Sequence, residues 1–137
     1  MNVLALDIGD SRVGVAYGDT STLVSCPVKV VLLSEVLNRS LTFKSIIDDY
    51  MPDMFIIGLP KTLHDEENMQ VKHIKEIASK ISDIYNIKYE FVDERLSSKE
   101  AKSILREQGL KEKDMKGKVD SVAASLFLET WLKMQKK

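Results

Sequence analysis

Acidic residues at three places in the chain have the chemistry of metal ligands. Asp7 interrupts an otherwise apolar segment, and Asp120 stands at the start of another. Asp93 and Glu94 directly follow a third apolar segment. A carboxylate in such a place has to be paired, hydrogen-bonded or bound to a cation, because burying an isolated charge is very unfavourable. These positions are therefore the first candidates for chemistry.

Carboxylates without histidine or cysteine partners are hard oxygen ligands, which suit Mg²⁺ or Mn²⁺ rather than zinc. Two such ions about 3.5 to 4 Å apart form a clamp for phosphodiester hydrolysis, in which one ion activates water and the other stabilises the leaving oxygen. Each acid also has a structural alternative. Asp7 could accept hydrogen bonds from the turn at residues 9–11, and Asp120 could accept the free amide hydrogens of a helix start. The metal-centre hypothesis depends on the three places converging.

Short apolar or alternating runs bounded by turn residues predict five strands. The brief Gly9–Ser11 turn predicts a hairpin, so the first two strands should be antiparallel. Pro27 in the third run argues for an edge strand or a bulge, because proline has no amide hydrogen for the ladder. The predicted strands cover residues 3–8, 12–18, 23–33, 53–58 and 87–92.

Apolar residues at three- and four-residue spacing predict four helices. Ser34 can cap the first, and Ser97 with Glu100 fits a capping box for the third. The predicted helices cover residues 34–50, 69–86, 97–109 and 119–133. The resulting order, β-β-β-α-β-α-β-α-α, predicts an α/β fold with a mixed five-stranded sheet flanked by helices, three antiparallel strands being followed by two parallel ones.

This topology is what would position the acids. Sites in such sheets form at the carboxyl ends of parallel strands. If the last helix starts at that same end, Asp7, Asp120 and either Asp93 or Glu94 converge there. Strand alternation puts Asp93 and Glu94 on opposite faces and leaves open which of them joins the site.

Composition limits the class of protein. A chain of 137 residues is one domain by length, covering residues 1–137. No start resembles a secretory signal and no run approaches the roughly 18 apolar residues that span a bilayer, so we expect a cytoplasmic protein without a membrane partner. The single cysteine, Cys26, excludes an intrachain disulfide and is expected in the core. A net charge of -1 excludes coating of nucleic acid by charge alone.

A lysine-rich stretch near the candidate acids offers countercharge for a phosphate backbone. Lys116 and Lys118 are the candidates for phosphate contact, although they could equally be solvated loop lysines. Arg12 and Arg95 are further candidates. Arg95 could instead pair with a neighbouring carboxylate.

Five short segments that contain or adjoin the candidate residues resemble, in their order along the chain, the YqgF/RuvX family of Holliday-junction resolvases, which have the ribonuclease H-like fold. The resemblance covers essentially the whole chain and implies a single ribonuclease H-like nuclease domain. Each motif is weak alone, whereas their order and spacing together are specific. The segments are LALDIG (4–9), RVGVA (12–16), IGLP (57–60), DERLSSKEA (93–101) and KGKVDSVAA (116–124).

The resemblance assigns the catalytic, metal-binding acids to Asp7, Glu94 and Asp120, with Mg²⁺ or Mn²⁺ as cofactor, and only the resemblance favours Glu94 over its neighbour. It implies a metal-dependent endonuclease acting on branched DNA or on the 5′ end of precursor 16S ribosomal RNA. Resolution of a junction by two symmetric cuts would require two active sites, and hence a homodimer.

Two positions depart from the family pattern. Residues 62–65 read Thr-Leu-His-Asp where the family commonly has an Asn-Met-Asp-Gly-like loop. Ala123 stands where related resolvases often carry a fourth acid, which predicts weaker metal binding. The competing hypothesis is a non-catalytic RNA-binding or ribosome-assembly factor on the same fold. An actin-like phosphotransferase is disfavoured, because such proteins clasp nucleotide between two domains.

Overall fold

The computed structural model describes residues 1–60, 69–93, 103, 104, 106, 107, 109 and 119–135. In this part of the chain, β1 and β2 are antiparallel, as are β2 and β3, whereas β4 lies parallel to both β1 and β5. The predicted mixed five-stranded sheet is thus confirmed. The strand order is β3-β2-β1-β4-β5, and the strands are β1 (Asn2–Ile8), β2 (Arg12–Asp19), β3 (Ser25–Leu32), β4 (Met54–Leu59) and β5 (Lys88–Asp93).

The third strand, β3, is an edge strand with a bulge, so both options predicted from Pro27 are confirmed. Lys29 pairs with Val15 and Pro27 pairs with Ala16, which leaves Val28 as the extra residue. The expectation that Cys26 lies in the core is wrong. Cys26 is exposed, and it lies in an edge strand of which only Val31 is buried.

The single helix predicted for residues 34–50 is also wrong. The structure has α1 (Leu33–Leu37) and α2 (Leu41–Tyr50) in its place. Between them Arg39 adopts a left-handed conformation, with φ of 56°, which an α-helix does not accommodate. Apolar residues continue at helical spacing on both sides of this break, and for that reason the sequence pattern suggests one helix.

Two long helices agree with prediction to within two residues at their ends: α3 (Met69–Tyr85) and α6 (Val119–Gln135). Residues 103, 104, 106 and 107 are helical, and the remainder of the helix predicted at 97–109 lies outside the described residues, apart from Gly109. Among the described helices, none has both the length and the apolar character needed to cross a bilayer.

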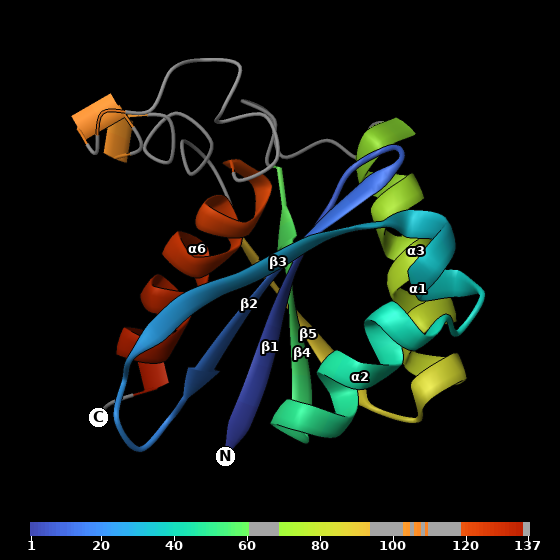
Figure 1. Ribbon diagram of the computed structural model, residues 1–137, viewed down its shortest axis with the longest axis horizontal. Helices are drawn as coiled ribbons and strands as arrows, with labels where there is room; N and C mark the ends of the chain where they lie inside the picture. Colours follow the sequence, from blue (N-terminus) through green and yellow to red (C-terminus); the bar gives the residue numbers. More distant parts are fainter. Residues whose placement is uncertain (61–68, 94–102, 105, 108, 110–118, 136–137) are drawn as a thin grey trace.

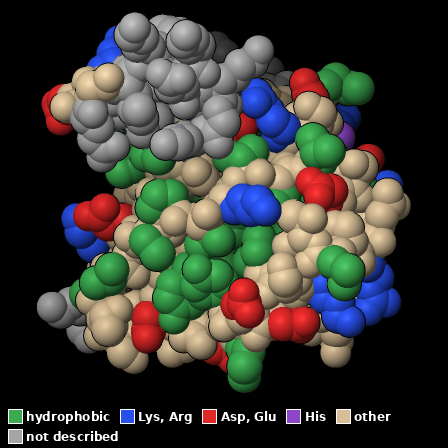
Figure 2. Space-filling view, in the orientation of Figure 1, with side chains coloured by type: hydrophobic (Ala, Val, Ile, Leu, Met, Phe, Trp, Pro, Cys, Tyr) green, Lys and Arg blue, Asp and Glu red, His purple; other side chains and the backbone are tan. Residues whose placement is uncertain are grey.

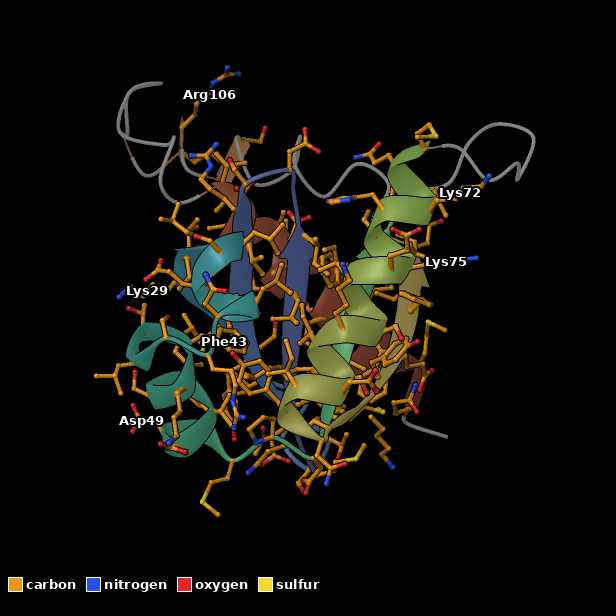
Figure 3. The ribbon with its side chains drawn as sticks, turned by 90° about the vertical axis from the view of Figure 1, so that its right-hand side faces the viewer. Lys29, Phe43, Asp49, Lys72, Lys75 and Arg106 are labelled. Carbon is orange, nitrogen blue, oxygen red and sulfur yellow. The ribbon has the colours of Figure 1, made fainter. Side chains whose placement is uncertain are left out.

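The helices divide into two groups that cover opposite faces of the sheet, with α6 on one face and α1, α2 and α3 on the other (Figure 1). Figure 3 views the second group of helices and shows Phe43 of α2 among other side chains. In the same view Lys72 and Lys75 project away from α3. Trp131 is 2 % exposed, as expected of a core residue. The core on the α6 side comprises Val3, Ala5, Ala16, Met54, Ile56, Ala124, Phe127, Leu128, Trp131 and Leu132.

Candidate active site

The three parallel strands, β1, β4 and β5, have their carboxyl ends at the same end of the sheet. Leu6 of β1 is level with Ile57 of β4, and Leu59 at the end of β4 is level with Asp93 at the end of β5. The start of α6 lies at this same end (Figure 1). Asp7, Asp93 and Asp120 therefore share one end of the molecule, as the topology predicts.

Asp7 faces the layer formed by α6. Val3 and Ala5, two and four residues earlier in β1, pack on the α6 side, whereas Leu4 and Leu6 pack on the other side. Because successive side chains of a strand alternate between faces, Asp7 continues the row of Val3 and Ala5. It is partly buried, while the rest of that row is fully buried. The carboxylate thus stands where the apolar layer under α6 ends.

A close contact at Gly14 brings the start of α6 to Asp7. Gly14 is the cross-strand partner of Asp7 in the β1–β2 ladder. A Cβ atom on Gly14 would lie 2.2 Å from both the carbonyl carbon and oxygen of Asp120, so only glycine leaves room for the helix there. Asp120 therefore sits directly over the strand position opposite Asp7. Two of the predicted acids come together through a glycine that the sequence analysis did not single out.

Asp93 belongs to the other face. Tyr89 and Phe91 pack against the core on the side of α1, α2 and α3, whereas Val92 packs against the core under α6. Alternation places Asp93 in the row of Tyr89 and Phe91, and so away from Asp7. Of the two alternatives left open by the sequence, the described geometry disfavours Asp93.

Four further predicted site residues, Glu94, Arg95, Lys116 and Lys118, lie outside the described residues, as does the atypical segment at 62–65. Ala123, which stands where related resolvases often carry a fourth acid, is among the described residues. Ala123 is completely buried, one helical turn after Asp120. That place in the helix is thus filled by a methyl group packed in the interior, and Asp120 is the acid that this turn contributes.

Arg12 forms an ion pair with Asp120 at this end of the sheet. It opens β2 two residues before Gly14 and so lies on the same face of the sheet. Its Nε atom is 4.0 Å from Oδ2 of Asp120, and the two side chains are 43 % and 31 % exposed. Arg12 is also a diagonal neighbour of Asp7 across the ladder, within reach of a long side chain. The described part of the site thus holds two carboxylates and one guanidinium.

The ligand atoms that the two acids offer are of the chemical type that a hard divalent cation binds. Both acids offer carboxylate oxygens, which are the ligands that Mg²⁺ and Mn²⁺ prefer. Within the described ranges no group of three or more potential ligands comes together. The two acids at Gly14 are therefore a partial ligand set, which a further acid from beyond Asp93 would extend to three.

Surface charge gives little further guidance on the face that Figure 2 shows. Basic and acidic side chains are interspersed there, around a central apolar area. On this face a binding partner is not marked by one uniform field, and the local arrangement at the end of the sheet is the more informative feature.

Comparison with known proteins identifies a family of nucleases that this chain resembles over nearly its full length. The family model described as "RuvX: Holliday junction resolvase" matches residues 1–134. A protein of Acaryochloris marina named "Putative pre-16S rRNA nuclease" is 31 % identical over 132 residues, which is 96 % of this chain and 92 % of the relative. A relative with the same name from Maridesulfovibrio salexigens is 35 % identical over 135 residues, covering 96 % and 98 % of the two chains.

Solved structures share the fold at low identity. The RuvC protein of T. thermophilus, solved in complex with a Holliday junction substrate, superposes with a TM-score of 0.57 at 12 % identity, over 98 % of this chain and 95 % of that one. The Fowlpox virus resolvase, solved with Holliday junction DNA, gives 0.59 at 15 % identity over the whole of both chains. The expected ribonuclease H-like, resolvase-type fold is confirmed. With the family model covering nearly its full length, the chain belongs to the RuvX family of Holliday junction resolvases.

Proposed function

We propose that this protein is a metal-dependent endonuclease that hydrolyses phosphodiester bonds in structured nucleic acid. The observation that supports the proposal is the close approach of the Asp120 backbone to Gly14, the cross-strand partner of Asp7. Membership of the RuvX family and the nuclease names of its relatives support the same activity.

In this proposal Asp7 and Asp120 hold the cation, and Glu94 completes the set. Glu94 follows Asp93 directly, and the placement of Asp93 on the opposite face is an argument for its neighbour. A bound Mg²⁺ or Mn²⁺ would activate the attacking water and stabilise the leaving oxygen. The chain's own part is to fix the carboxylates in place and to present countercharge to the phosphates on either side of the cut.

The substrate is either branched DNA of the Holliday-junction type or the 5′ end of precursor 16S ribosomal RNA. We would incubate both labelled substrates with the protein in Mg²⁺, in Mn²⁺ and in chelator. Cleavage of one or both that is lost in chelator is the expected result, and the preferred substrate then defines the activity. Binding of the RNA without cleavage in any condition would contradict the nuclease and favour a ribosome-assembly role.

Junction resolution further implies a homodimer, because two symmetric cuts need two active sites. Sedimentation of the protein alone and with a four-way junction measures this directly. A junction complex that contains two protein chains is expected if DNA junctions are the substrate.

Lys116 and Lys118 are proposed to bind phosphate, together with Arg12 and Arg95. Changing Lys116→Ala and Lys118→Ala together should weaken nucleic-acid binding and make the plot of log K against log salt shallower by up to about 1.8, because each lost phosphate contact contributes about 0.9. The double variant Lys44→Ala and Lys80→Ala removes the same charge from exposed positions on α2 and α3, and is the control. Equal salt slopes for the wild type and the Lys116/Lys118 variant would remove these lysines from the interface.

A further inference from the structure

The ion pair of Arg12 uses the carboxylate of Asp120, which the proposed cation would also need as a ligand. Arg12 and Asp120 are both partly exposed, with Nε and Oδ2 4.0 Å apart, and the pair lies on the α6 face of the sheet beside Asp7. A guanidinium and a divalent cation at one carboxylate repel each other. The geometry therefore sets Arg12 and the cation in competition for Asp120.

We infer that Arg12 is a removable counter-ion of the metal centre, which neutralises Asp120 in the absence of a divalent cation and transfers to a substrate phosphate when the cation binds. This inference rests on the proposed function. The side chain of Arg12 is 43 % exposed, so its guanidinium can swing towards solvent without breaking the core. Arginine suits both states, because its fork of donors matches carboxylate and phosphate alike.

The exchange stabilises each state by a different pairing. Without a cation, the positive charge of Arg12 offsets the repulsion between the carboxylates of Asp7 and Asp120. With a cation bound, the same charge is no longer needed there and adds a phosphate contact next to the reacting centre. Arg12 is thus a phosphate-binding residue that makes nucleic-acid binding stronger in the metal-loaded protein.

The first measurement is a Mn²⁺ titration of the protein without nucleic acid, followed by calorimetry, on the wild type, Arg12→Gln and Asp7→Asn. Arg12→Gln should bind Mn²⁺ about tenfold more tightly, which is the effect of removing one unit charge about 6 Å from a divalent ion in water. Arg12→Lys keeps the charge and should stay near the wild type. Arg39→Gln, at an exposed position between α1 and α2, controls for net charge and should change nothing.

The second measurement is the affinity for a four-way DNA junction, in chelator and in Ca²⁺, with intact substrate verified on a gel. Arg12→Gln should behave like the wild type in chelator, where the arginine is held by Asp120. In Ca²⁺ the variant should bind several-fold more weakly, with a salt slope shallower by about 0.9. A structural role alone would not produce opposite effects on cation and junction affinity.

The outcomes separate this inference from the proposed function. If wild-type protein binds Mn²⁺ and Asp7→Asn does not, the metal centre stands, and an unchanged Mn²⁺ affinity in Arg12→Gln overturns the role of Arg12 alone. If Arg12→Gln weakens junction binding equally in chelator and Ca²⁺, the exchange is overturned. If the wild type binds no Mn²⁺, both the proposed metal centre and the exchange are overturned. Thermal unfolding of each variant verifies that it is folded.

Discussion

Replacing Asp7 by asparagine should abolish nucleic-acid cleavage, lowering the rate by more than about a hundredfold, while the protein stays folded. The asparagine has nearly the same shape, but it removes the negative charge that a divalent cation requires. Loss of a partner around a metal site already costs 10- to 100-fold, and loss of a ligand itself should cost more. The rate is measured with labelled substrate in excess Mn²⁺.

Stability should respond in the opposite direction to activity. Asp7 is partly buried at the end of an apolar row. Asp7→Asn therefore removes the desolvation cost of a charged side chain and its repulsion by Asp120. The variant should unfold at the same temperature as the wild type or at a higher one when no metal is present. Asp10→Asn makes the same chemical change at an exposed turn position and should leave cleavage within a few-fold of the wild type. Full activity in Asp7→Asn would disprove the metal site.

Adding one methyl group at Gly14 should damage both the fold and the site. In Gly14→Ala the new Cβ would meet the backbone of Asp120 at 2.2 Å, and a backbone cannot rotate away as a side chain can. Overpacking of this kind costs about 3 kcal/mol, so the urea midpoint should fall markedly. The first turn of α6 must move off the strand, which should also weaken Mn²⁺ binding through displacement of Asp120.

Gly18→Ala is the matched control for Gly14→Ala. Gly18 lies in the same strand on the same face, but its added Cβ would meet the side-chain ends of Leu128 and Leu132 at 2.9 and 3.0 Å. These can shift, so Gly18→Ala should lose less stability and keep its Mn²⁺ affinity. Equal urea midpoints and equal Mn²⁺ affinity for Gly14→Ala and the wild type would show that the contact does not position Asp120.

Strands were predictable because their signals are local. Alternation, the Gly9–Ser11 turn and the position of Pro27 specify a hairpin and an edge strand without knowledge of the rest of the chain. The helix predicted across residues 34–50 failed because apolar spacing does not report a single left-handed residue such as Arg39. The exposure of Cys26 was missed because its residue type alone suggested a core position, although Pro27 already marked its strand as an edge strand.

The acids were predictable from residue type, but their meeting was not. An aspartate within an apolar run marks Asp7, and topology suggests that Asp120 starts its helix at the same end of the sheet. Their proximity depends on Gly14, whose role appears only when a strand and a helix distant in sequence are packed together. A glycine inside a strand pattern is the signal that could have indicated such a close approach.

The measurement that tests the central claim most directly is the location of Mn²⁺ by anomalous X-ray scattering in crystals soaked in that ion. The account predicts an anomalous peak within about 2.0 to 2.6 Å of carboxylate oxygens from both Asp7 and Asp120. The peak should disappear in Asp7→Asn crystals treated in the same way. Saturating Mn²⁺ that leaves both carboxylates without a metal, or that binds only elsewhere on the protein, would contradict a metal-dependent nuclease centre at this end of the sheet.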